Sequence, residues 1–268
     1  MRIFLLVLLT SFSLQTQGQS SSSQHIQCTL DSIDHDSLHS NINPVEMVIQ
    51  EASQNWSGYA GATNILNPKH GSVTAVTGTW VIPTVQKSSN QTYSASWIGI
   101  DGLSNGSVEQ IGTAQNWSNG SQQNYAWFEM YPRSAYIING FPVQNGDIIS
   151  AWINYVGSGV FQMTIENVTR KVYFTVPTSY TTNLSAHRSS AEWIMEAPSS
   201  VTGILPLANF GKEIFLNCRA IIEGVAAPIV NNNWQCVELL MDTSTRAIKA
   251  LPSTVSGGSN FNVTWEHQ

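Results

Sequence analysis

The chain contains few charged residues. Asp, Glu, Lys and Arg make up 10% of its 268 residues, whereas they make up about 25% of a typical globular protein. With 11 Lys and Arg and a formal net charge of −6, the chain lacks the basic surface that nucleic-acid binding requires. Acid unfolds proteins mainly by protonating paired carboxylates and by accumulating positive charge. We therefore expect acid tolerance, although a neutral extracellular protein with a polar coat would have the same composition.

Cysteine and histidine are also scarce, with three and six residues respectively. The histidines are scattered and no CxxC spacing occurs, so the sequence predicts no metal site and no cofactor. A serine hydrolase is not indicated either, because the chain has no GxSxG motif. Cys218 and Cys236 both lie near the C-terminus and are expected to form a disulfide, whereas Cys28 belongs to a polar N-terminal segment.

Long apolar stretches are absent except near Met1. Arg2 precedes the apolar run 3–9, which is well short of the ~20 residues that span a bilayer. A basic residue, a short apolar core and polar residues around Gly18 are typical of a secretory signal peptide. We predict a signal peptide over 1–18, a pro-segment or polar tether over 19–54, and a secreted product without a membrane anchor.

The residues from Asn55 onward predict an all-β domain that extends over 55–268. Segments such as 72–82, 151–156 and 172–176 alternate small polar residues with β-branched or aromatic ones, and turn-forming residues bound each of them. Stretches with helical periodicity are almost absent. Many short strands without intervening helices favour a sandwich or a barrel.

Three of the few carboxyl groups lie in aromatic strand segments. Glu129 shares one strand face with Trp127, and Glu192 and Glu196 share one face of a later strand, because side chains alternate with a period of two. A carboxyl group on an aromatic sheet face is partly desolvated, which raises its pKa and suits it to acid–base catalysis. For any single glutamate, a solvated strand face is the simpler explanation.

Five short segments occur in a characteristic order. They are NWSGY (55–59), WIGIDG (97–102), EQIG (109–112), AWFEMYP (126–132) and AEWIME (191–196). Together they resemble the glutamic peptidases, or eqolisins, which are secreted, acid-acting endopeptidases with a Gln/Glu dyad. The resemblance covers the chain from Asn55 to its end. It implies a concanavalin-A-like sandwich of two large antiparallel sheets, which agrees with the strand pattern.

The resemblance also implies residue roles. The catalytic glutamine corresponds to Gln110, and the catalytic glutamate to the second Glu of AEWIME, Glu196. Residues expected to line or support the substrate cleft are Trp97, Asp101, Trp127 and Glu129. The chain departs from the family pattern at two positions, where Ala114 and Tyr125 replace aspartates, and both changes put the acidic hydrogen-bond network of the cleft in doubt.

The expected chemistry needs no metal. Glu196 would take a proton from the attacking water and pass it to the leaving amine, while Gln110 would stabilise the oxyanion and orient that water. The expected partners are polypeptide substrates, with neither nucleic acid nor a membrane bound by the processed protein, and we expect a monomer. The alternative is a carbohydrate-binding or glycoside-hydrolase protein on the same sandwich, in which Glu129 and Glu196 would form a carboxylate pair.

Overall fold

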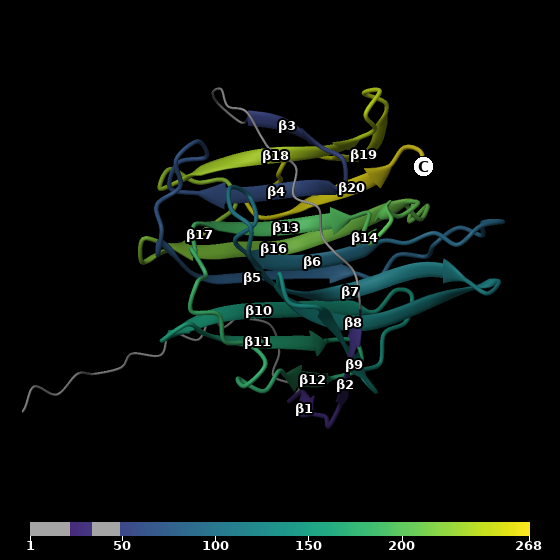
Figure 1. Ribbon diagram of the computed structural model, residues 1–268, viewed down its shortest axis with the longest axis horizontal. Coiled ribbons are helices and arrows are strands. Elements are labelled where there is room, and N and C mark those ends of the chain that lie inside the picture. The colour runs from purple at the N-terminus through teal and green to yellow at the C-terminus, as the bar shows by residue number, and fades with distance from the viewer. Residues whose placement is uncertain (1–21, 34–48) are drawn as a thin grey trace, which may run out of the picture.

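The computed structural model describes residues 22–33 and 49–268. These residues form strands, turns and loops without an α-helix among them, which confirms the predicted all-β class. The strands lie side by side across the view of Figure 1. The predicted signal peptide lies outside the described residues, and within them there is no helix that could cross a membrane.

The first sheet carries the residues of the five motifs. Its strands follow the order β3–β18–β4–β13–β6–β7–β8–β9–β2, and all neighbours except β3 and β18 are antiparallel. The strands are β2 (Thr29–Ile33), β3 (Ile49–Ser53), β4 (Trp56–Ala62), β6 (Ala95–Ile100), β7 (Val108–Ser118), β8 (Ser121–Tyr131), β9 (Ala135–Asn139), β13 (Ser190–Glu196) and β18 (Gln235–Asp242).

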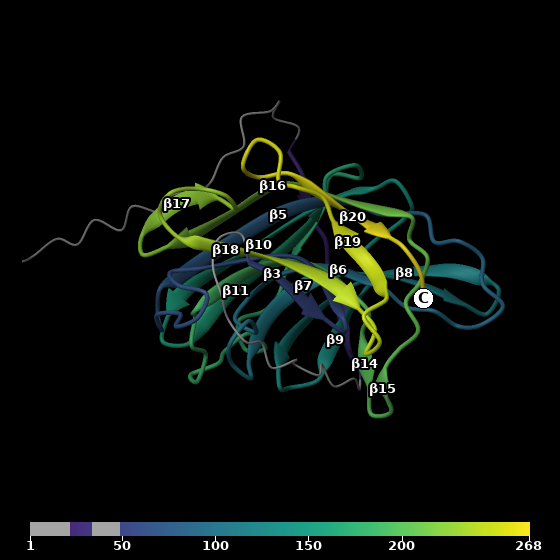
Figure 2. The same cartoon turned by 90° about the horizontal axis from the view of Figure 1, so that it is seen from above.

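The second sheet packs against the first and is joined to it through two short strands. Its order is β1–β12–β11–β10–β5–β16–β20–β19, and β19 pairs with β18 of the first sheet. Figure 2 shows the resulting layers from above. The strands are β1 (Gln24–His25), β5 (Val73–Val81), β10 (Ile148–Gly157), β11 (Val160–Asn167), β12 (Val172–Thr175), β16 (Lys212–Ile222), β17 (Val225–Pro228, paired with β16), β19 (Ile248–Pro252) and β20 (Phe261–Trp265).

The main core lies between the two sheets. Trp80 and Phe215 from the second sheet meet Ile98, Ile111 and Trp193 from the first, and all are fully buried. A second apolar cluster, which includes Trp56, Trp97 and Trp127, lies on the opposite face of the first sheet. Because side chains alternate along each strand, this sheet is buried on both faces, and the second face is the one that can hold a site.

The described part of the predicted pro-segment forms edge strands. The strand β1 pairs with β12, β2 pairs with β9, and β3 pairs with β18. Among the described named strands, the two parallel pairings both involve this segment. The weak periodicity of the sequence did not predict these strands, because an edge strand is held by backbone hydrogen bonds more than by an apolar face.

The predicted Cys218–Cys236 disulfide is wrong. Both cysteines are free, as is Cys28. Cys218 lies on β16 in the second sheet and points into the core, whereas Cys236 lies on β18 in the first sheet, opposite Gly61. Closeness in sequence was a poor guide because the two strands belong to different sheets.

A carboxyl group is buried inside the main core. Glu213 of β16 accepts a hydrogen bond from the Ser96 hydroxyl at 2.6 Å and another from the Ile214 amide at 3.1 Å. No salt bridge to it occurs among the described residues, and burial raises its pKa to about 8 although its hydrogen bonds lower the pKa. Glu213 is therefore a neutral carboxylic acid over most of the acid and neutral range.

This burial predicts that the protein loses stability as pH rises. The Glu213 carboxyl ionises near 4.5 in the unfolded chain and near 8 in the folded one, so unfolding releases a proton between these values. The free energy of unfolding should then fall by about 1.4 kcal/mol per pH unit from this group alone. In Glu213→Gln, which resembles the neutral acid, urea unfolding at pH 5, 6 and 7 should show a smaller decline. The matched control is Glu223→Gln, which alters an exposed glutamate paired with Lys69; equal declines in both variants would contradict the prediction.

Candidate active site

The candidate site lies on the face of the first sheet that points away from the main core, hereafter the site face. The strand register brings residues from four motifs onto this face. Gln110 on β7 is opposite Glu129 on β8 and Gly99 on β6, and Gly99 is opposite Glu192 on β13. Glu196 lies four residues after Glu192 on β13 and is opposite Ala95 of β6.

Trp97 occupies the centre of the site face. A Cβ atom added at Gly99 would lie 2.8 Å from the Trp97 ring. A Cβ atom added at Gly112 would lie 2.5 Å from the Cβ atom of Trp97. The glycines of the WIGIDG and EQIG segments therefore leave the space in which the indole lies. The Trp56 ring meets it edge-on, with ring centroids 5.0 Å apart.

Glu196 is held by the groups around Trp97. The indole Nε1 of Trp97 donates to its Oε2 at 2.7 Å, and the side-chain amide of Asn55 donates to Oε1 at 3.3 Å. Burial raises the pKa of Glu196 to about 7, while the hydrogen bonds from Trp97, Trp56 and Asn55 lower it. A carboxyl group with a pKa near neutrality can both give and take a proton.

Gln110 is almost fully buried and is hydrogen-bonded to Glu129. Its Nε2 donates to Glu129 Oε2 at 2.5 Å. Its amide oxygen is buried and has no hydrogen-bond partner among the described residues. An unpaired buried acceptor is costly, so this oxygen is suited to accept a hydrogen bond from a water or a substrate.

Glu192, Gly99 and Gln110 are opposite one another on β13, β6 and β7 and so form one row across the strands. Glu192 lies at the end of this row next to β4 and has no exposed surface. Burial raises its pKa well above the usual carboxyl range. The Ser190 hydroxyl offsets this effect in part, whereas Asp101 and Glu109 raise the pKa further. Glu192 is therefore a neutral acid in the interior of the site.

Asp101, from the WIGIDG segment, anchors the start of β13. The residue has a left-handed backbone conformation with a φ of 72°, which favours a turn directly after β6. Its carboxylate accepts hydrogen bonds from the backbone amides of Arg188 and Ser189, at 2.6 and 2.8 Å, and from the side chains of Ser189 and Asn105. Asp101 therefore supports the site by fixing the strand that carries Glu192 and Glu196.

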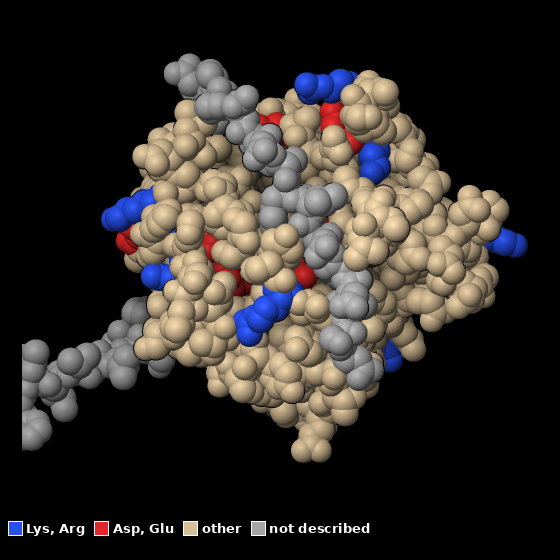
Figure 3. Space-filling view, in the orientation of Figure 1, with Lys and Arg blue, Asp and Glu red and all other residues tan. Residues whose placement is uncertain are grey.

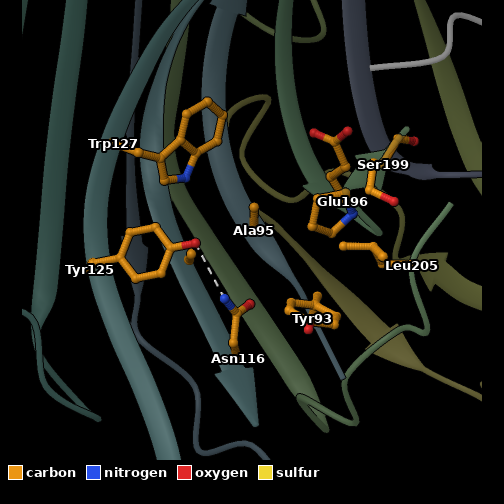
Figure 4. Close-up of a pocket in the computed structure, with 11 residues that line it drawn as sticks. Tyr93, Ala95, Asn116, Tyr125, Trp127, Glu196, Ser199 and Leu205 are labelled. Atoms are coloured by element: carbon orange, nitrogen blue, oxygen red, sulfur yellow. Dashed lines mark hydrogen bonds between the residues drawn. The ribbon is translucent and has the colours of Figure 1, made fainter. Parts of the chain in front are cut away.

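A pocket opens beside Glu196, as Figure 4 shows. It has a volume of about 140 Å³. Trp127, which was expected in the substrate cleft, is one of the residues that line it. Sequence reasoning missed other lining residues, among them Tyr93, Asn116 and Leu205. The missed residues lie outside the five motifs, and only the fold brings them to the site face.

The register separates Gln110 from Glu196. They lie on strands two places apart and four residues apart along the strand direction, so a flat sheet would place their Cα atoms about 16 Å apart. The structure brings Gln110 into direct contact with Glu129 and not with Glu196.

Charged side chains are sparse on the face of the molecule that Figure 3 draws. Figure 3 shows that most of the surface on the side seen in Figure 1 is uncharged. The described residues hold two salt bridges, Lys69–Glu223 and Arg170–Asp147. They also contain no group of three or more His, Cys, Asp or Glu that could hold a metal ion. The site residues thus offer proton transfer and hydrogen bonding as their own chemistry.

Comparison with known proteins gives the same family as the motifs. The model of the Peptidase A4 family matches residues 54–265. Aspergillopepsin-2 of Aspergillus niger is 28% identical over 195 residues, which make up 65% of this chain and 67% of that protein. Among solved structures, scytalido-glutamic peptidase with a transition state analog inhibitor is 21% identical with a TM-score of 0.63, covering 80% of this chain and 98% of its own. Aspergilloglutamic peptidase from Aspergillus niger is 25% identical with a TM-score of 0.56, covering 65% and 99%.

The structural matches confirm the predicted β-sandwich. The family match extends over most of the chain and includes all five motifs. The chain belongs to the Peptidase A4 family and is a glutamic endopeptidase.

Proposed function

We propose that the protein is a secreted endopeptidase that cleaves polypeptides in acid with Gln110 and Glu196 as its catalytic pair. The observation that carries this proposal is the position of Glu196. This carboxyl group lines an open pocket, is held in place by Trp97 and Asn55, and has a pKa near neutrality. Secretion rests on the signal-like segment 1–18.

The raised pKa decides which form of Glu196 works in acid. Below pH 7 the group is mainly a carboxylic acid, so the acid form must be the active one if the enzyme acts in acid. In the proposed reaction, Glu196 gives its proton to the scissile carbonyl oxygen while water adds to the carbon. The proton that the water releases returns to Glu196, which then protonates the leaving amine. A gem-diol proton restores the acid as the C–N bond breaks.

Gln110 has a complementary role in this proposal. Its unpartnered amide oxygen accepts a hydrogen bond from the attacking water. Glu129 fixes the amide through the Nε2 contact, so the orientation is set before substrate arrives. An amide does not titrate, and this positioning therefore survives in acid.

Glu192 is the competing candidate for the catalytic carboxyl. It shares a residue row with Gln110, and only Gly99 lies between them. However, it has no exposed surface and its pKa is raised well above the usual range. Access to the pocket favours Glu196, whereas alignment with Gln110 favours Glu192.

The glycoside-hydrolase alternative is not supported by the geometry. Glu129 and Glu196 lie three strands and four residues apart, which in a flat sheet separates their Cα atoms by about 20 Å. Glycosidase carboxyl groups lie roughly 5–9.5 Å apart. In addition, Glu129 is already hydrogen-bonded to Gln110.

Three substitutions test the catalytic pair. Gln110→Ala should lower kcat by about 10²-fold, because the acceptor that positions the attacking water is lost. Glu196→Gln should lower kcat at least as much, because no proton can be exchanged. Glu192→Gln should stay within a few-fold of the parent, since Gln resembles the neutral acid already present. Peptide hydrolysis at pH 4 measures kcat, and circular dichroism checks that each variant is folded.

The same experiment separates the two glutamates. An inactive, folded Glu192→Gln beside an active Glu196→Gln would assign the catalytic role to Glu192. No peptide cleavage by the parent protein at any pH would refute the proposed function as a whole.

The pH profile is the second test. If the acid form of Glu196 is active, kcat/KM should be high below pH 7 and fall as pH rises through about 7. The reverse profile, rising through pH 7, would show that the carboxylate is the active form. Circular dichroism at each pH distinguishes titration of the site from unfolding, and EDTA should leave the activity unchanged.

A further inference from the structure

The pocket beside Glu196 has the size and lining of a binding site for a substrate side chain. We propose that it accepts a large apolar side chain, such as Leu or Phe, from one of the two substrate residues that flank the scissile bond. This inference rests on the proposed peptidase function and specifies its substrate preference.

The volume of the pocket sets the size of its occupant. It is about 140 Å³, and an apolar protein cavity of roughly 150 Å³ is large enough to bind benzene. A phenyl or isobutyl group therefore fits, whereas a methyl group would leave most of the pocket unfilled. Glu196 forms part of the wall, so the occupant must be next to the reacting carbonyl.

The floor of the pocket is made of small residues and its sides are aromatic. Ala95 and Ala114 are opposite each other on β6 and β7, and Tyr125 on β8 is opposite Ala114. Tyr93 and Trp127 also line the pocket (Figure 4). Ala114 and Tyr125 are the two positions at which the chain departs from the aspartates of the family pattern, so a methyl group and a phenol ring lie where two carboxyl groups are expected.

A short hairpin forms the outer wall. The strands β14 (Ser199–Ser200) and β15 (Gly203–Ile204) pair with each other, and the Leu205 amide closes the hairpin with a hydrogen bond to the Pro198 carbonyl at 2.8 Å. Ser199 and Leu205 line the pocket. The Ser199 hydroxyl is buried and has no hydrogen-bond partner among the described residues, so it can donate to a backbone carbonyl of a bound peptide.

The polar groups of the pocket favour an uncharged occupant. The Asn116 amide donates to the Tyr125 hydroxyl at 3.3 Å, and Glu196 accepts hydrogen bonds from Trp97 and Asn55. No Lys, Arg or His is among the lining residues. A charged side chain would lose its hydration here without gaining an opposite charge as long as Glu196 is protonated.

Two substitutions, one in the floor of the pocket and one in its outer wall, test the proposal. Cleavage sites in an unfolded protein substrate are mapped by mass spectrometry at pH 4, and kcat/KM is measured for peptides with Phe, Leu or Ala beside the scissile bond. Ala114→Leu fills the pocket and should lower the Phe-to-Ala ratio of kcat/KM by at least about tenfold. Leu205→Ala enlarges the pocket and should reduce the preference for Leu relative to Phe. Val201→Ala, at the exposed turn of the same hairpin and 83% exposed, should change neither ratio.

The outcomes separate this inference from the proposed function. A parent protein that cleaves no peptide refutes the proposed function. A parent that cleaves peptides without preference for large apolar residues, or whose preference is unchanged in both Ala114→Leu and Leu205→Ala, refutes only the inference. If Ala114→Leu does not fold, the shift in Leu205→Ala relative to Val201→Ala decides the question.

Discussion

The burial of carboxyl groups without cations is the constraint on which the rest of the structure depends. Glu192, Glu196 and Glu213 are all buried, and burial raises the pKa of each of them. A buried carboxylate without a cation costs several kcal/mol, whereas the neutral acid needs only hydrogen bonds. The fold is therefore most stable where these groups are protonated. The low content of Lys and Arg is consistent with these raised pKa values, because a cation buried beside a carboxyl group would lower its pKa and ionise it.

The same property joins stability to chemistry. Glu213 projects from the second sheet into the main core, whereas Glu196 lies on the far face of the first sheet, and the two groups become ionised over neighbouring pH ranges. An acidic solution that keeps Glu213 protonated in the core also keeps Glu196 protonated in the pocket. The composition, with 11 Lys and Arg in 268 residues, supplies few cations that could ionise these carboxyl groups.

The sequence predicted the class of fold, because that class depends on local pattern, whereas the predicted site residues rest on the resemblance to a family and stay a prediction. The alternation of polar and apolar residues predicted the strands and placed Glu192 and Glu196 on one face of a strand. It could not choose between them, since that choice depends on the register between β13, β6 and β7. Nor could it find Tyr93 and Leu205, which reach the pocket through loops and the β14–β15 hairpin. The disulfide prediction failed for the same reason, because sequence proximity does not assign a strand to a sheet.

The register also explains why the motifs are spaced as they are. Trp97 needs Gly99 beside it on its own strand and Gly112 opposite it on β7, because any Cβ there would meet the indole or its backbone. With the indole in this position, its Nε1 donates to Glu196, and its ring fills the space above Gly99, between Gln110 and Glu192. A tryptophan, two glycines and two glutamates are thus one geometric unit. Ala114 and Tyr125 lie in the same row as Glu196, because Ala95 is opposite both Glu196 and Ala114, and Ala114 is opposite Tyr125. The pocket therefore borders directly on this unit.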